Sequence, residues 1–124
     1  MSTDPPPMTS RDISAAAAVA APNAIAIELR EALGADLVAR MTRVENELVD
    51  QWAAGGQAPS AQDKQTLRAV FEIYKTLAGP QTPKLARAWL LGLNPDFERR
   101  QPAEVFASGQ ARDVLLKAEN YVNS

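Results

Sequence analysis

The sequence contains neither cysteine nor histidine. Without cysteine the chain has no disulfide framework and no thiolate chemistry. Without histidine it lacks the most common general base and the most common transition-metal ligand. No pair of acidic residues on an apolar face stands out as a replacement acid and base. We therefore expect a protein that is not an enzyme and that needs no metal ion or cofactor.

Charge of one sign and long apolar runs are also scarce. The net charge is −2, with 7 basic and 10 acidic residues at 1–79 and 6 basic and 5 acidic residues at 80–124. Neither part carries the broad basic stripe of a strong nucleic-acid binder. No apolar run approaches the ~20 residues that a membrane helix needs, and the alanine-rich stretch at 13–22 lacks the basic leader of a signal peptide. We expect a cytoplasmic protein with no membrane contact.

The composition favours helices throughout. The chain of 124 residues is rich in alanine and leucine, 46% of it is hydrophobic, and it shows no strand-like alternation. Its length predicts one domain or two very small ones. Residues 1–20 include three consecutive prolines and several polar residues, which is typical of a disordered leader, and the alanine run there indicates at most a nascent helix. Such a short chain has a thin core, so dimerisation is a common way to bury more surface.

Apolar spacing and helix-breaking residues predict about seven short helices after residue 20. Ile25, Leu29 and Leu33 recur at four-residue spacing, with Asn23 as the expected N-cap and Gly34 as the end. Two more short helices are expected at 35–41 and 45–54. The residues predicted to lie in the core rather than in a site are Leu37, Val38, Leu48, Trp52 and Leu67.

The later helices have clearer start signals. Ser60 and Asp63 form a pair like a capping box at the start of a long helix that ends near residue 79. Pro83 and Pro102 each suit the first position of a helix. A final helix is expected at 110–122, with Val114, Leu115, Ala118 and Val122 facing inward.

The segment DQWAAGGQAPSAQDKQTLRAVFEIYKTL resembles the end of an Xre/Cro-type helix-turn-helix. Trp52 is the residue that closes the core under the reading helix, and Pro59 with a preceding glycine shapes the exit turn. The resemblance covers about residues 25–78 and implies a degenerate helix-turn-helix domain at 21–79, whose third helix reads DNA. The expected DNA contacts are Arg40, Arg43, Asn46, Gln51 and Lys64.

The same third helix also carries Glu45, Glu47 and Asp50. Phosphates repel carboxylates, and phosphate contacts supply much of the affinity for DNA, although a carboxylate can accept a hydrogen bond from cytosine. Two interpretations therefore stay open. The helix-turn-helix binds DNA in a dimer-dependent way, or it is retained as a scaffold or an interaction surface.

The segment at 87–122, RAWLLGLNPDFERRQPAEVFASGQARDVLLKAENYV, resembles the C-terminal domain of Xre/MbcA/ParS-type antitoxins. The matching features, in order, are Trp89, Asn94-Pro95, Arg100-Gln101-Pro102, the small helix at 103–106, Gly109 and Val114-Leu115. Many members have a glycine-rich loop after the Asn-Pro pair, whereas the loop here is charged at 96–100.

The two prolines in this segment predict a rigid corner between two helices. Asn94 is pushed out of the helical region by Pro95, its side chain can cap a tight turn, and Pro102 restarts a helix at once. The aromatic and apolar residues expected to pack in one cluster, as core or as an exposed interface, are Trp89, Leu93, Phe97 and Phe106.

The resemblance implies an all-α protein with an N-terminal Xre-like helix-turn-helix bundle and, at 80–124, a small helical toxin-binding and oligomerisation domain. Such a protein binds and neutralises a cognate RES-domain toxin that degrades NAD, binds its own operator DNA, and forms a homodimer or a larger complex with the toxin. The expected toxin contacts are Phe97, Arg99, Arg100, Lys117, Asn120, Tyr121 and Asn123. Two alternatives stay open, a stand-alone regulator from a phage or mobile element and a structural adaptor.

Overall fold

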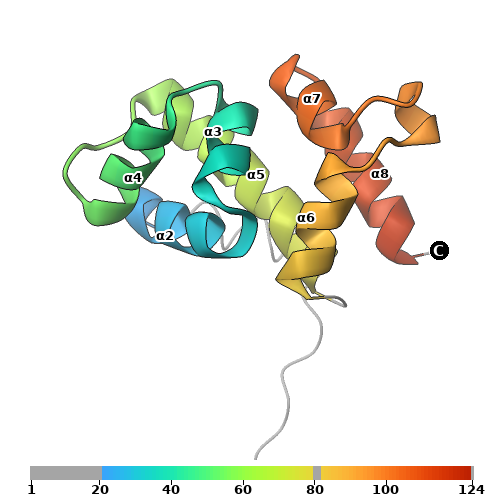
Figure 1. The fold of residues 1–124 in the computed structure, drawn as a ribbon, viewed down its shortest axis with the longest axis horizontal. Coiled ribbons are helices and arrows are strands. Elements are labelled where there is room, and N and C mark those ends of the chain that lie inside the picture. The colour runs from blue at the N-terminus through green and yellow to red at the C-terminus, as the bar shows by residue number, and fades with distance from the viewer. Residues whose placement is uncertain (1–20, 80–81, 124) are drawn as a thin grey trace, which may run out of the picture.

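A computed structural model describes residues 21–79 and 82–123. This part of the chain is all-α and contains no strand, which confirms the predicted fold class (Figure 1). The predicted leader at 1–20 lies outside the described residues. The helices are α2 (Pro22–Leu33), α3 (Ala35–Thr42), α4 (Asn46–Ala54), α5 (Ala61–Ala78), α6 (Pro83–Leu91), the short 3₁₀ helix η1 (Pro95–Phe97), α7 (Pro102–Ala107) and α8 (Ala111–Asn123).

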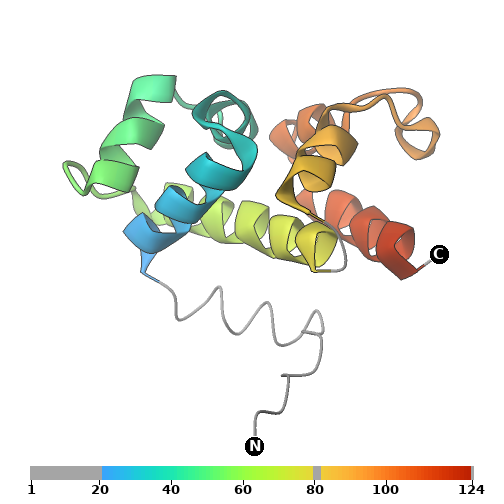
Figure 2. The same ribbon diagram turned by 60° about the horizontal axis from the view of Figure 1, so that its bottom comes forward.

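The helices form two groups that are joined by one long helix. Figure 1 shows α2, α3 and α4 on one side and α6, α7 and α8 on the other, and Figure 2 shows α5 running beneath both groups. Helix α5 packs against α2 in the first group and against α8 and α6 in the second. Because it serves both groups, α5 buries Leu67, Val70, Phe71, Ile73, Tyr74, Thr76 and Leu77.

One continuous hydrophobic cluster runs through both groups. Leu37, Val38, Trp52 and Leu67 are buried, as predicted, and Leu48 is half-buried against them. Complete burial of a side chain of this size contributes about 1.5–3 kcal/mol relative to exposure. The cluster crosses position 80, so the two predicted domains share a single core rather than holding separate ones.

The helix starts show which local signals were informative. Ser60 is the N-cap of α5 and its Oγ accepts a hydrogen bond from the Asp63 backbone N–H at 3.1 Å, which confirms the predicted capping. Thr82 precedes Pro83 at the start of α6, also as predicted. The prediction for Asn23 was wrong, because α2 begins at Pro22 and Asn23 lies in its first turn. Proline at this position already has a helical φ.

The expected aromatic cluster forms only in part. Phe97 and Phe106 are buried and Trp89 is half-buried against the core. Leu93 is 71% exposed, which matches the second alternative, a cluster that stays partly at the surface. In the final helix, Val114 and Ala118 face inward as predicted, and Leu115 and Val122 are half-buried. None of the helices within 21–79 and 82–123 combines the length and apolar character needed to cross a membrane.

Candidate functional site

The loop between α6 and α7 is built as a closed corner. Asn94 has extended backbone angles, and its Oδ1 accepts a hydrogen bond from the Asp96 N–H at 2.9 Å, which starts η1. The Asn94 backbone N–H donates to the Arg100 carbonyl at 3.1 Å, so the two ends of the loop meet. Glu98 and Arg99 both adopt positive φ, at 56° and 65°. Left-handed residues other than glycine cost about 1–2 kcal/mol each, so the surrounding contacts must hold this shape.

Three contacts hold the corner in place. The Phe97 side chain is buried in the core, only 6% exposed. The Arg100 Nε donates to the Phe97 carbonyl at 3.2 Å. The Gln101 Nε2 donates to the Leu91 carbonyl at the end of α6, at 2.9 Å. Pro102 is buried and begins α7 directly. The loop is therefore fixed to both flanking helices, as the two prolines predicted.

Two hollows lie between this corner and α8. The first has a volume of about 420 Å³ and is lined by Trp89, Gly92, Leu93, Asn94, Pro95, Asp96, Asn120 and Tyr121. The second has a volume of about 320 Å³ and is lined by Asp96, Phe97, Glu98, Arg100, Gln110, Asp113, Leu116 and Lys117. Because they share Asp96 and follow the same helix, we treat them as one surface, called the α8 groove.

One face of α8 forms a wall of this groove. Asp113, Leu116, Lys117, Asn120 and Tyr121 recur at the three- and four-residue spacing of a helix face. The opposite face packs on α5 and α7. Helix α8 is thus amphipathic, yet its outer face is not purely polar.

The groove displays large apolar side chains to solvent. Leu93 is 71% exposed, Leu116 is 55% exposed and Tyr121 is 43% exposed. The rings of Trp89 and Tyr121 pack with their centroids 5.9 Å apart. This contact joins α6 to α8 and gives the groove an aromatic floor beside the exposed Leu93.

The structure brings together five of the seven residues predicted to contact a toxin. Arg100, Lys117, Asn120 and Tyr121 line the α8 groove. Phe97 also borders it but is buried, so its position supports a framework role. Leu116 and Asp113 also line this surface and were not among the predicted site residues. Both residues are three or four positions from Lys117 or Asn120 on the same helix face, and this spacing is the signal that indicates them.

Two of the predicted contacts lie apart from the groove lining. Arg99 is exposed at the tip of the corner, and Asn123 is exposed at the last described turn of α8. Leu93, for which core and interface positions were both open, is exposed, and the Gln101 side chain binds the Leu91 carbonyl two residues before it.

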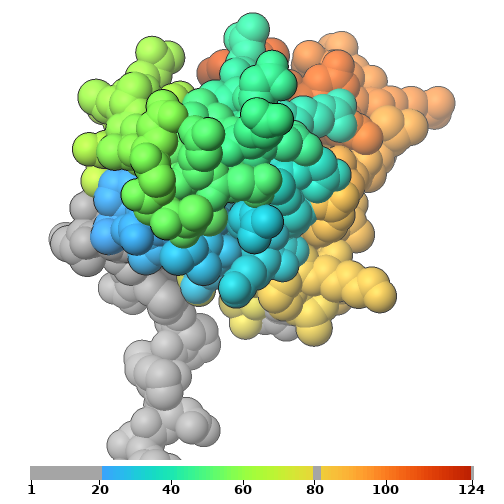
Figure 3. Space-filling view, turned by 60° about the vertical axis from the view of Figure 1, so that its left-hand side comes forward, coloured from blue at the N-terminus to red at the C-terminus, as the bar shows by residue number. Residues whose placement is uncertain are grey.

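The helix-turn-helix candidate is α3, a tight turn and α4. Arg43 ends α3 in the left-handed conformation with φ 62°, and the Val44 N–H donates to the Ala39 carbonyl at 3.0 Å. Helix α4 packs on α2 and α3 and buries Val49 and Trp52. Figure 3, which looks onto this side, shows α4 (green) at the surface. Its outer side is therefore accessible to a partner.

The charges on this side are mixed. Among the residues predicted to contact DNA, Arg40, Arg43, Asn46 and Gln51 are exposed and Lys64 is half-buried. Glu45 and Glu47 are also exposed at the start of α4. Asp50 pairs with Arg30 of α2 at 2.6 Å, which neutralises one of the three carboxylates.

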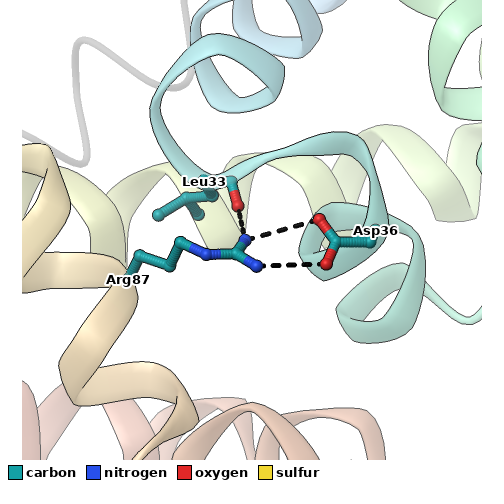
Figure 4. A network of polar contacts seen from close by, with 3 residues as sticks. All are labelled: Leu33, Asp36 and Arg87. Carbon is teal, nitrogen blue, oxygen red and sulfur yellow. Dashed lines mark hydrogen bonds and ion pairs between the residues drawn. The ribbon is translucent and has the colours of Figure 1, made fainter.

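A second polar contact joins the two helix groups (Figure 4). Arg87 of α6 donates to the carbonyl of Leu33 at the end of α2. The same guanidinium binds the Asp36 carboxylate, with Nη2 3.1 Å from Oδ2. This hydrogen bond is the main cause that holds the pKa of Asp36 below its usual value. Gly34, with φ 89°, makes the corner between α2 and α3 at this point.

No known family, no curated protein and no solved structure matches this chain. The residues within 21–79 and 82–123 hold no group of three or more His, Cys, Asp or Glu side chains that is arranged to bind a metal ion. The geometry of the α8 groove and of the α3–α4 face is therefore the basis for a functional assignment.

Proposed function

We propose that this protein is an antitoxin that binds and inhibits a toxin through the α8 groove, with α3 and α4 as a DNA-binding element for its own operator. The observation that carries the proposal is the exposure of Leu93, Leu116 and Tyr121 around a rigid corner. Large apolar side chains gathered on one surface mark interaction sites. Aromatic anchors dominate the binding energy of such sites.

The shape of the groove favours a protein partner over a small molecule. Sites for small ligands bury 70–90% or more of the ligand, as a general rule. The α8 groove instead runs along one helix and is open to solvent, with Leu93 projecting from its edge. Its rim carries both charge signs, from Asp96, Arg100 and Lys117. An apolar centre with a polar rim is the usual anatomy of a protein interface.

The identity of the partner rests on the resemblance to Xre/MbcA/ParS-type antitoxins. That resemblance runs through Trp89, Asn94-Pro95 and Gly109, which lie in the groove or in the helix junctions that shape it. It implies a RES-domain toxin that degrades NAD. We therefore propose a RES-domain enzyme encoded beside this gene as the cognate partner.

The experiment measures NAD⁺ consumption by that purified enzyme while this protein is titrated in. We expect consumption to stop near the stoichiometric ratio of the complex. Leu93→Ala should raise the inhibition constant about tenfold, since loss of an interface anchor costs about 1–2 kcal/mol. Unchanged NAD⁺ consumption at a large molar excess of the wild-type protein would contradict the proposal.

Leu85→Ala is the matched control for that variant. Leu85 is also an exposed leucine, 49% accessible, but it does not line the α8 groove. We expect Leu85→Ala to inhibit as the wild type does. If both variants weaken inhibition equally, the contact lies elsewhere on the C-terminal helices and the assignment to the groove is wrong.

The second candidate function is a stand-alone transcriptional regulator. The observation that favours it is the exposure of Asn46 and Gln51 on α4, because both side chains can form paired hydrogen bonds with bases. Arg40 and Arg43 supply positive charge beside them. A mobility shift with the promoter duplex tests this candidate. Specific binding without any effect on the toxin would favour the regulator over the antitoxin.

A further inference from the structure

The outer side of α8 carries four charged residues that have no ion-pair partner within the described part of the chain. They are Arg112, Asp113, Lys117 and Glu119. The ion pairs between described residues are Arg30–Asp50, Lys75–Glu28 and Arg87–Asp36, and none involves α8. Leu116, 55% exposed, lies in the middle of this set.

The order of the charges has a symmetry that a second copy of α8 can use. Along the helix the signs run positive, negative, positive, negative at 112, 113, 117 and 119. Reversal of the helix direction about residue 115 exchanges Asp113 with Lys117, and it brings Arg112 of one copy within one residue of Glu119 of the other. Both pairings place opposite charges together, which is the requirement for a two-fold symmetric contact.

We propose that two copies of this protein associate through antiparallel α8 helices, with Asp113 of each copy facing Lys117 of the other. Leu116 is one residue, a rise of about 1.5 Å along the helix, from the two-fold axis. The two Leu116 side chains therefore pack beside each other at the centre of the interface. Asn120 and Tyr121 then meet the start of α8 in the other copy, near Gln110 of the groove wall.

A parallel pairing of the same faces is unfavourable. It would place Asp113 beside Asp113 and Lys117 beside Lys117, and like charges at an interface oppose association. The antiparallel order also brings a positive charge toward Glu119, which lies near Glu72 of α5 and adds to the rise in the pKa of Glu72. Arg112 of the other copy approaches Glu119 in this arrangement and offsets that repulsion.

Apolar contact and charge have separate roles in this interface. Exposed ion pairs each contribute little to affinity, so Leu116, Tyr121 and Leu93 supply most of the attraction. The charges select the antiparallel direction and the register. We therefore expect a dimer of modest affinity whose formation responds to the sign of the residues at 113 and 117.

Sedimentation equilibrium of the full chain at low ionic strength tests this directly. We expect a monomer–dimer equilibrium for the wild type. Asp113→Lys and Lys117→Asp should each raise the dimer dissociation constant about tenfold or more, because each creates like-charge contacts. The double variant restores opposite charges and should dimerise within about threefold of the wild type. An equimolar mixture of the two single variants should form heterodimers, since each supplies the charges that the other lacks.

Three outcomes would overturn the proposal. They are a wild type that stays monomeric at high concentration, a dimer that is indifferent to both charge reversals, and a double variant as weak as the single variants. Asp113 is exposed and Lys117 is half-buried, and far-UV circular dichroism of each variant checks that α8 still forms. The interface does not rest on the proposed toxin partner. A charge-dependent dimer stands whether or not NAD⁺ consumption is inhibited.

Discussion

Replacement of Gly34 by alanine should destabilise the junction between the two helix groups. Gly34 has φ 89° and ψ 146°, a backbone conformation that is essentially confined to glycine. A Cβ atom at this position would lie 2.7 Å from Asp36 Oδ1 and 3.0 Å from Arg87 Nη1. The substitution therefore strains the backbone and also displaces the ion pair that links α3 to α6.

The size of the effect follows from these two contributions. Backbone strain of this kind costs about 1–3 kcal/mol. The Arg87–Asp36 pair is largely exposed, so its loss adds only ~0.2–1 kcal/mol. We expect Gly34→Ala to lower the free energy of unfolding by about 1–4 kcal/mol. That is a large share of the ~5–15 kcal/mol that stabilises a typical protein.

Urea unfolding followed by circular dichroism measures this loss. In an Asp36→Ala background the contact with Asp36 Oδ1 is absent and the ion pair is already lost, so Gly34→Ala should cost about 0.2–1 kcal/mol less there, with backbone strain remaining. The Arg87–Asp36 ion pair also makes the free energy of unfolding depend on pH. The pKa of Asp36 is lower in the folded state than its ordinary value of 3.8. The stabilisation by this ion pair is therefore present above pH 3.8 and is lost as the pH falls through the folded pKa. A loss under about 0.5 kcal/mol for Gly34→Ala, the size of an ordinary surface change, would refute the reasoning.

Three further predictions concern other surfaces. Ser60→Ala should lower the free energy of unfolding by about 1 kcal/mol in urea melts, because it removes the cap on α5, whereas Ser60→Asp should not. The pKa of Glu72 is raised by burial and by Glu119, so the stability of the fold should increase as the pH falls through the folded pKa of Glu72. Glu72→Gln should abolish this increase and stabilise the protein at neutral pH, as measured by thermal melts. Glu47→Lys should tighten binding to duplex DNA and steepen its salt dependence by about one unit in an anisotropy titration; unchanged affinity would show that α4 does not approach phosphates.

The helices and most of their starts were predictable because their causes are local. Ser60, Pro83 and Pro102 each act on the backbone within one turn, so their effects are visible in the sequence. Asn23 illustrates the limit of the same reasoning. Two residues, Asn23 and Pro22, competed for one helix start, and the fixed φ of proline decided the outcome without any side-chain cap.

The candidate site was predictable only in part because its shape depends on contacts between distant positions. The loop around Leu93 is held by Gln101, whose side chain binds the carbonyl of Leu91, ten residues earlier. The junction between Arg87 and Asp36 spans 51 residues. No local pattern shows which distant group such an arginine or glutamine residue will bind.

The two proposed uses of the α8 groove constrain each other. A second copy of α8 covers Leu116 and Tyr121, and a toxin that binds through Leu93 and Tyr121 needs part of the same surface. Both partners cannot occupy Tyr121 at once, so self-association reduces the fraction of free groove, and the apparent toxin affinity falls by that fraction. A modest dimer affinity is then physically required for inhibition to work, because a tight dimer would hold the groove closed. The sparse charges that flank Leu116 are suited to a contact of that strength.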